Sequence, residues 1–425
     1  MKTSLLICAA ALLTGCPPPA PANETVDAGS TPGDAGMSDA GSADAGLSDA
    51  GSDDAGTADA GSIDAGSSDA GEAIDAGVRD GGAVQFGFVG AYLGGVASFT
   101  LNSTNGTLSA APGSPAVAGG SILGLARHPN ARWLYAVDVD ASQILGLQVD
   151  AADGRVSALP GFPMALTGSP RTLAVDPLGR FLYVAISNGT VPLSGSIGLY
   201  AIDPLTGALS AVAGSPFATS SEPASLEPDS TGRVLYVSQA EPGIWAFSVN
   251  AAGALTEIAG SPFASTTPAI ARGGAIVLHP NGRFLFTARD ALNGFSIDAT
   301  SGALTPLAGS PFQANVGGDP GASNLALTGD GRFLYAITFN GGRLHAFSVN
   351  AGSGALAPVA GSPFNTSPAP YSVAVEPSGR FLYVATDLGQ IAGYSIDGAS
   401  GAVTALGGPP HAFTGMQPQL VIEDP

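Results

Sequence analysis

Lysine is nearly absent from this chain: Lys2 is the only one in 425 residues, and the formal net charge is −20. A protein that binds nucleic acid, or an anionic membrane surface through its folded part, needs a band of basic side chains. No stretch of this sequence supplies one, so we expect no nucleic-acid partner. Charged residues make up only 11% of the chain, whereas its 61 glycines and 33 prolines indicate a fold rich in turns.

Cysteine and histidine are also scarce, and this limits metal chemistry. The chain has two cysteines, Cys8 and Cys16, and four histidines, none of them at the spacing of a zinc site. No glycine-rich loop precedes a predicted helix, so a phosphate-binding loop is not indicated either. We therefore expect neither a metal nor a cofactor.

The N-terminus, "MKTSLLICAAALLTGC", has one lysine followed by an apolar run. The run is shorter than the roughly 20 residues that a membrane-spanning helix needs, and it is typical of a secretory signal peptide. Its last four letters resemble the lipobox of bacterial lipoproteins. The resemblance implies that residues 1–15 are removed and that a lipidated Cys16 anchors an exported protein to the cell envelope, at the outer membrane or the cell surface. The alternative is an ordinary secretory signal with an incidental cysteine.

Residues 16–82 repeat the triplet Asp-Ala-Gly, mostly every five residues. The segment has almost no large apolar side chains and many like charges, so it predicts a disordered tether. Weak calcium binding by its aspartates is an alternative, although the ligand spacing of a calcium loop is missing. Residues 1–80 hold 14 of the 34 acidic residues, so the remainder is only mildly acidic.

Three motifs repeat in residues 83–425. "AGSPF" begins at residues 213, 259, 308 and 360, with weaker copies at 111, 159 and 406. "GRFLYV" and its relatives occur six times, at intervals of 48 to 53 residues. A short alternating strand such as "AFSVN", followed by a turn and "GAL", occurs seven times. Alternation bounded by Gly, Pro, Asn and Asp predicts strands, so each unit is expected to be a four-stranded antiparallel meander.

Seven such units predict an all-β fold, a seven-bladed β-propeller. "GRFLYV" occurs six times, whereas the other two motifs occur seven times. This difference is explained if the chain enters the first blade at its second strand, in "FGFVGAY", and completes that blade with "PQLVIEDP". Pairing of the N- and C-terminal strands would close the ring and leave no free sheet edge.

The repeats "HPNGRFLF", "DPLGRFLYV" and "EPSGRFLYV", together with "FSVNAGSGAL", resemble the lactonase-type seven-bladed propellers. Members of that family hydrolyse 6-phosphogluconolactone, and relatives include muconate-lactonizing enzymes. The resemblance covers residues 84–425 and specifies the fold more than the chemistry.

Residues repeated in every unit are interpreted as scaffold. We expect the phenylalanine of "AGSPF" to pack between blades, and the motif arginines and tyrosines to stabilise the blades. These residues are Phe217, Phe263, Phe312 and Phe364; Arg132, Arg180, Arg233, Arg283, Arg332 and Arg380; and Tyr135, Tyr183, Tyr236 and Tyr383. The histidines are also expected to be structural: His128, His279, His345 and His411.

Residues that interrupt the repeat are better functional candidates. The loops that lead into the innermost strands, and those between second and third strands, meet on one face of a propeller around the axis, here called the mouth. The first set carries Arg171, Glu222, Arg272 and Asp319, with Tyr371, and the second carries Asp138, Asp140, Glu241, Arg289, Asp290 and Asp387. The alternation of arginines with carboxylates predicts a site for a small polar or anionic ligand. The alternative is that these side chains form ion pairs with one another. Asp138, Asp387, Asp319 and Tyr371 are the candidate ligand-binding residues of this set.

Lactone hydrolysis requires a group that activates water and donors that stabilise an oxyanion. The resemblance implies His, Arg and a carboxylate near the mouth; Arg171 fits the family's Pro-Arg-His segment, but Thr172 follows where the histidine would stand. The candidate catalytic set is therefore Arg171, Glu222 and Arg272. Two functions stay open: a monomeric envelope lipoprotein that binds a small ligand or an envelope protein, and a lactonase acting at the mouth.

Overall fold

The computed structural model describes residues 85–117, 120–189, 194–239, 243–264, 274–288, 291–312, 324–339 and 341–423. Within these ranges the chain forms strands and turns, and no helix there is long and apolar enough to cross a membrane. The predicted signal peptide (residues 1–15), the predicted lipidation at Cys16 and the predicted tether (residues 16–82) lie outside the described residues and stay predictions.

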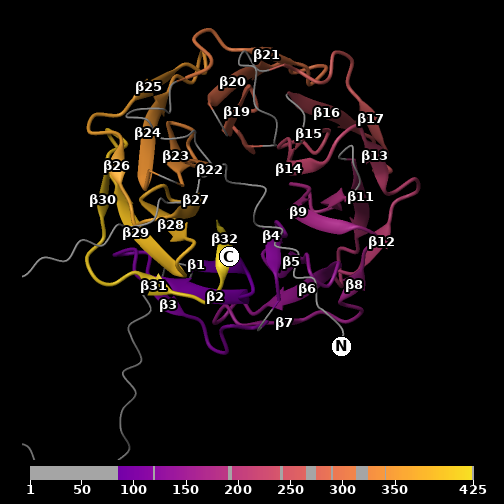
Figure 1. The fold of residues 1–425 in the computed structure, drawn as a ribbon, viewed down its shortest axis with the longest axis horizontal. Helices are drawn as coiled ribbons and strands as arrows, with labels where there is room; N and C mark the ends of the chain where they lie inside the picture. Colours follow the sequence, from indigo (N-terminus) through magenta and orange to yellow (C-terminus); the bar gives the residue numbers. More distant parts are fainter. Residues whose placement is uncertain are drawn as a thin grey trace, which may run out of the picture. The chain divides into compact units, whose positions relative to one another are not determined.

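Seven antiparallel sheets surround a central axis, which confirms the predicted β-propeller (Figure 1). We number the blades 1 to 7 from the sheet that contains β1. The first, innermost strands are β32 (Met416–Glu423), β4 (Ile122–Arg127), β9 (Ser169–Val175), β14 (Pro223–Pro228), β18 (Ala275–Leu278), β22 (Asn324–Leu327) and β27 (Pro370–Val375). The second strands are β1 (Gln85–Tyr92), β5 (Trp133–Asp138), β10 (Phe181–Ser187), β15 (Val234–Gln239), β19 (Phe284–Ala288), β23 (Phe333–Thr338) and β28 (Phe381–Thr386).

The outer half of each blade is formed by a long and a short strand. The third strands are β2 (Gly95–Leu101), β6 (Gln143–Val149), β11 (Gly195–Ile202), β16 (Ile244–Val249), β20 (Leu292–Ile297), β24 (Arg343–Val349) and β29 (Gln390–Ile396). The fourth strands are β3 (Leu108–Ala110), β7 (Val156–Ala158), β12 (Leu209–Ala211), β17 (Leu255–Glu257), β21 (Leu304–Pro306), β25 (Leu356–Pro358) and β30 (Val403–Ala405).

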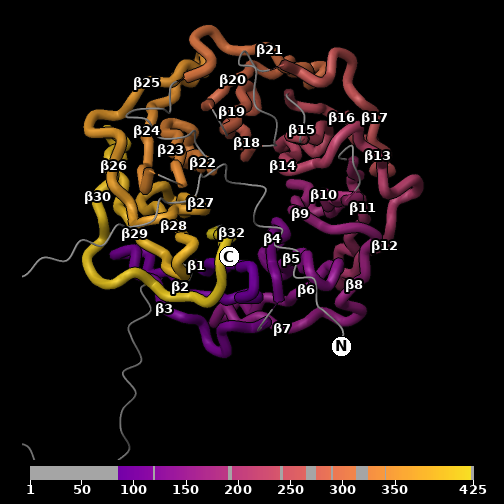
Figure 2. Tube along the Cα trace, in the orientation of Figure 1, coloured from indigo at the N-terminus to yellow at the C-terminus, as the bar shows by residue number. Residues whose placement is uncertain are grey.

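Blade 1 is built from both ends of the propeller, as predicted. Its strand order is β3-β2-β1-β32, and β1 pairs with β32 over Phe86↔Glu423 to Tyr92↔Met416. In Figure 2 the yellow β32 lies beside the indigo β1. This arrangement explains why "GRFLYV" occurs six times, because β1 is not preceded by the turn that carries the motif in other blades.

The core consists of clusters that each span two neighbouring blades. Phe333 and Tyr335 of blade 6, for example, pack in one cluster with Val373 and Leu382 of blade 7. Second strands are apolar on both faces because each face meets another blade. Most of the ring's hydrophobic stabilisation therefore lies between blades.

The "AGSPF" loops do more than connect blades. After each fourth strand the chain returns to the third strand, and in four blades it forms an additional short strand: β8 (Met164–Ala165), β13 (Phe217–Thr219), β26 (Phe364–Asn365) and β31 (His411–Ala412). In five blades the loop's serine or its equivalent accepts a hydrogen bond from a third-strand amide at 2.8 to 3.1 Å. The proline follows a cis peptide bond in six loops. The expected packing of the phenylalanines between blades is confirmed.

The motif arginines have the structural role expected of them. In five blades the guanidinium lies 5.1 to 5.6 Å from the centre of the following aromatic ring. Arg233 is followed by Val234 and instead donates to the carbonyl of Ala299 in the next blade at 3.2 Å. Arg180 likewise donates to the carbonyl of Gly232 at 2.8 Å. The hydrogen bonds of Arg180 and Arg233 thus join neighbouring blades on the face opposite the mouth.

Buried tyrosines join neighbouring blades through a repeated hydrogen bond. A second-strand tyrosine hydroxyl donates to a glycine carbonyl in the next blade, in the turn between its third and fourth strands, at 2.8 to 3.0 Å; the donors are Tyr135, Tyr236, Tyr335 and Tyr383. Tyr183 is equally buried, but its hydroxyl has no partner among the described residues. The facing turn, Asn250–Ala254, is one residue shorter than Asp298–Ala303 in the next blade, so its glycine carbonyl does not meet the hydroxyl.

We expect opposite results from the same substitution at two of these tyrosines. Tyr236→Phe removes a buried hydrogen bond and leaves the Gly302 carbonyl without its donor, which should lower the free energy of unfolding by about 1–2 kcal/mol. Tyr183→Phe removes an unpaired buried hydroxyl and should leave that free energy unchanged or raise it. Urea denaturation measures both, and equal losses in the two variants would contradict this account.

Candidate functional site

Arg171 and Glu222 form an ion pair at the mouth. Arg171 lies in β9 of blade 3, and Glu222 directly precedes β14 of blade 4. The Arg171 Nε donates to Glu222 Oε1 at 2.7 Å, and the two side chains are 43% and 16% exposed. The structure therefore brings together two of the three predicted catalytic residues and leaves the guanidinium open to solvent.

Local sequence explains why these side chains stand at the mouth. Pro170 and Pro223 lie near the start of β9 and β14, and each pairs with a residue near the end of a second strand, Ile186 or Gln239. An innermost strand is a sheet edge, and a proline is tolerated there when its nitrogen faces away from the paired strand. The amide of Ser221 donates to Gln239 Oε1 at 2.9 Å, which fixes the loop that carries Glu222.

Asp138 and Asp387 bind backbone amides of the mouth loops. The Asp138 carboxylate is buried and accepts from the amides of Ser121 and Ala141 at 3.4 and 3.2 Å. Asp387 accepts from the amide of Gln417, just inside β32, at 2.5 Å. Each aspartate thus orients a loop, and ligand binding by either one stays a prediction. Asp140 accepts from the Ser121 hydroxyl at 2.6 Å.

Tyr371 occupies in blade 7 the position that Arg171 has in blade 3, since each follows a proline paired to the end of a second strand. Its ring meets Phe339 of blade 6 edge to face, with centroids 6.3 Å apart and an interplanar angle of 87°. The mouth therefore has an aromatic pair on blades 6 and 7 and an ion pair on blades 3 and 4.

The remaining predicted mouth residues fall outside the described residues. These are Arg272, Asp319, Glu241, Arg289 and Asp290. Convergence of Arg272 with Arg171 and Glu222 therefore stays a prediction.

No histidine among the described residues lies at the mouth. His128 and His279 stand in turns on the opposite face. The carbonyl of Gly179 accepts a hydrogen bond from the His128 Nε2 at 3.0 Å. His345 is buried in β24, and His411 lies in β31 at the rim of the blade. Thr172, beside Arg171, pairs with Ala185 in the sheet. The expectation that the histidines are not part of a mouth site agrees with these positions.

One charged residue of the innermost strands, Glu227, was not predicted as a site residue, because the candidates were charged residues in loops. Glu227 lies on β14 and pairs with Tyr236. The residues paired with the equivalent second-strand aromatic in the other six blades are all alanine or valine: Ala126, Ala174, Val277, Ala326, Ala374 and Val421. Aligning the seven inner strands by their pairing would have shown Glu227 as the exception.

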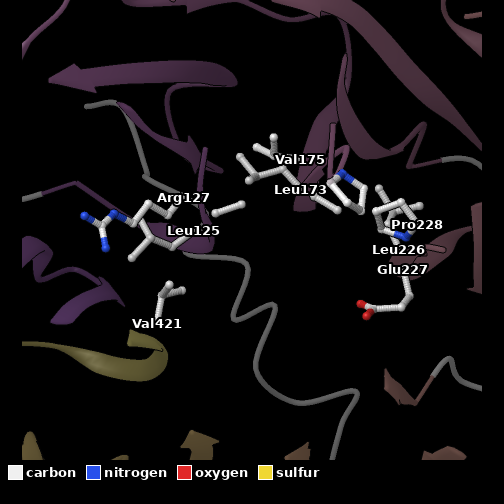
Figure 3. A pocket seen from close by; sticks show the side chains of 11 residues that line it. Leu125, Arg127, Leu173, Val175, Leu226, Glu227, Pro228 and Val421 are labelled. Atoms are coloured by element: carbon white, nitrogen blue, oxygen red, sulfur yellow. The ribbon is translucent and has the colours of Figure 1, made fainter. Parts of the chain in front are cut away.

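Glu227 borders a cavity of about 280 Å³ formed by β4, β9, β14 and β32 (Figure 3). The lining is mainly apolar, with Leu125, Leu173, Leu226 and Val421 among its members. Burial raises the pKa of Glu227 to about 8, and a hydrogen bond with the backbone of Leu278 on β18 opposes that rise. A carboxyl with this pKa is largely protonated at neutral pH.

Glu227 should make stability depend on pH. The folded protein keeps the proton up to about pH 8, whereas the unfolded chain releases it near the ordinary value of 4.5. The contribution of Glu227 to stability is therefore most favourable below pH 4.5 and becomes less favourable as the pH rises from there to 8. Glu227→Ala removes this pH-dependent contribution and should be more stable than the wild type at pH 8.5. We expect a difference of about 1–3 kcal/mol, because the Glu227 residue is partly exposed and solvent screens the penalty.

Urea denaturation of the two proteins at pH 5 and pH 8.5 measures this difference. We expect the advantage of the alanine variant to shrink at pH 5. A difference that is the same at both values would show that Glu227 titrates normally.

Comparisons with known proteins agree with this architecture. The family model described as "Lactonase, 7-bladed beta-propeller" matches residues 275–416, which span blades 5 to 7. No curated protein sequence matches the chain.

Solved structures match over nearly the whole propeller. The periplasmic gluconolactonase of Pseudomonas aeruginosa is 21% identical, with a TM-score of 0.64 over 80% of this chain and 99% of that one. A Bacteroides uniformis protein, provisionally assigned as a 6-phosphogluconolactonase, is 19% identical with a TM-score of 0.64 over 80% of this chain and 100% of that one. A Bacteroides fragilis protein with the same provisional assignment is 20% identical, with a TM-score of 0.64 over 82% and 100%. At these identities the likeness concerns the fold: the chain forms a seven-bladed β-propeller of the architecture seen in these proteins.

Proposed function

We propose that the propeller binds a small anionic ligand, such as a sugar acid, at its mouth. The observation that carries this proposal is the ion pair of Arg171 and Glu222, which holds an exposed guanidinium at the mouth. A guanidinium has five N–H donors in a rigid plane, and the bond from Nε to Glu222 uses one of them. The remaining donors suit a carboxylate or phosphate group of a ligand.

The aromatic pair of Tyr371 and Phe339 complements this cation. It lies on blades 6 and 7, whereas the ion pair lies on blades 3 and 4. An aromatic face and a hydroxyl are suited to a ring that is apolar on one side and hydroxylated at its edge. A ligand with a ring and an acidic group would use both parts of the mouth.

Lactone hydrolysis is the second candidate. It is favoured by the family-model match and by the likeness to the P. aeruginosa periplasmic gluconolactonase. Glu222 would activate water, and Arg171 with Arg272 would stabilise the oxyanion. Because Thr172 replaces an imidazole beside Arg171, we place ligand binding first.

We further propose that the protein is exported and attached to the cell envelope through a lipidated Cys16, with residues 16–82 as a tether. The lipobox-like end of the signal sequence supports this, and one neighbour in structure is periplasmic. A long acidic tether suits a domain that reaches for its ligand or for an envelope protein away from the membrane.

The mouth site is tested by calorimetric titration of gluconate into the chain from residue 16 onward. Arg171→Ala should weaken binding at least tenfold, about 1.4 kcal/mol, because the anion loses its charged donor. Arg155→Ala is the matched control: Arg155 also pairs with a carboxylate, Asp153, at 3.1 Å, but on the face opposite the mouth. Unchanged binding in Arg171→Ala, or no binding to the wild type of gluconate or any lactone tested, would overturn the proposal.

The same proteins decide between the two candidate functions. Hydrolysis of a panel of sugar lactones is followed beside an Arg171→Ala, Glu222→Ala double variant. Turnover above the spontaneous rate that vanishes in the double variant would identify a hydrolase. Rates equal to buffer in both, with binding retained by the wild type, would identify a binding protein.

A further inference from the structure

The cavity beside Glu227 is separate from the mouth. Glu222 directly precedes the inner strand β14, and Glu227 lies near the end of that strand; the two are five positions apart, or about 16 Å at the rise of a strand. The cavity is lined by the later halves of the inner strands, and its lining also includes Pro177, which follows β9. A ligand held at the mouth by Arg171 would therefore not occupy this space.

The fold does not require a carboxylate at this position. The six other blades close their inner ring with alanine or valine at the equivalent register. Placing a carboxyl among apolar walls costs free energy unless a partner compensates it. Glu227 is thus a departure from the repeat that we expect to destabilise the free protein, and such departures point to binding.

No described residue forms an ion pair with Glu227. Among the described residues that line the cavity, Arg127 is the one other charged side chain, and in Figure 3 its guanidinium is turned away from the Glu227 carboxyl. The Arg127 guanidinium donates to the carbonyl of Ala131 at 3.0 Å and lies 5.6 Å from the ring centre of Phe88. The remaining side chains that line the cavity from β4, β9, β14 and β32 are apolar, and β18 offers Glu227 the backbone of Leu278.

We propose that this cavity is a second binding site, which takes a small organic ammonium ion with an apolar body. The charged group would pair with the Glu227 carboxylate, and the apolar body would lie against Leu125, Leu173 and Val421. A cavity of about 150 Å³ holds benzene, so about 280 Å³ accommodates a substituted six-membered ring. A metal ion fits less well, because one carboxylate supplies too few oxygen ligands.

Binding by this site should release a proton. Glu227 has a raised pKa in the free protein, and only its ionised form pairs with an ammonium group. An alkylamine stays protonated below about pH 10, as lysine does. The affinity for the amine should therefore rise at least tenfold between pH 6 and pH 9, with Arg127 charged throughout.

The test uses cyclohexylmethylamine and its neutral analogue cyclohexylmethanol as probes, titrated into the full chain by calorimetry at pH 6 and pH 9. We expect the wild type to bind the amine more tightly than the alcohol at pH 9, and Glu227→Ala to lose at least tenfold in affinity for the amine alone. Arg171→Ala, which alters the mouth, should bind the amine as the wild type does. That control separates this proposal from the one for the mouth.

Glu227→Ala has the residue found in other blades, so it should fold, and Glu227→Gln provides a second variant of nearly the same shape. Three results would each overturn the proposal: no amine binding by the wild type at pH 9, equal affinity for amine and alcohol, or undiminished amine binding in both Glu227 variants.

Discussion

The pairing of β1 with β32 is the constraint on which the rest of the ring depends. Six blades are each formed by a continuous stretch of chain, but blade 1 takes its innermost strand from the C-terminus and the other three from the N-terminal part of the propeller. Without β32, blade 1 would expose the edge of β1, and the core between blades 7 and 1 would lose Leu420 and Ile422. The ring is therefore closed by hydrogen bonds and by apolar packing at the same seam.

That closure also positions functional candidates. Gln417, near the start of β32, meets Asp387 of blade 7 at the mouth, and Val421, further along the strand, lines the cavity beside Glu227. One strand thus contributes to both proposed sites. The scaffold between them is repetitive: arginine over the next aromatic ring, tyrosine to the next blade, and the returning "AGSPF" loop. Functional side chains can therefore occupy positions where the repeat is interrupted, with little effect on the stability of the other blades.

Much of this architecture could be predicted because each blade repeats the same pattern. The number of blades, the closure, and the packing of Phe217 and its equivalents follow from periods and turn residues. The return of each "AGSPF" loop to the third strand could not be predicted, because the repeated serine does not indicate which backbone amide its hydroxyl accepts from. The missing partner of Tyr183 depends on a turn that is shorter by a single residue.

The candidate site was less predictable than the fold. The ion pair of Arg171 with Glu222 joins residues 51 positions apart, and the sequence placed them together only through the expected position of their loops on one face. Glu227 was overlooked because an acidic residue within an apolar strand resembles an ordinary solvent-facing position. Glu227 stands out only when the strand register is known, because the register shows that alanine or valine occupies the equivalent position in the six other blades.

The most direct test of the account is thermal unfolding of a chain that ends at Gly415 and so lacks β32. A chain that lacks only residues 424–425 is the control. If pairing of β1 with β32 closes a cooperative ring, the shorter chain should unfold about 10 °C or more below the control and over a broader range, because a whole inner strand is lost. An unfolding temperature and width equal to those of the control would contradict the account.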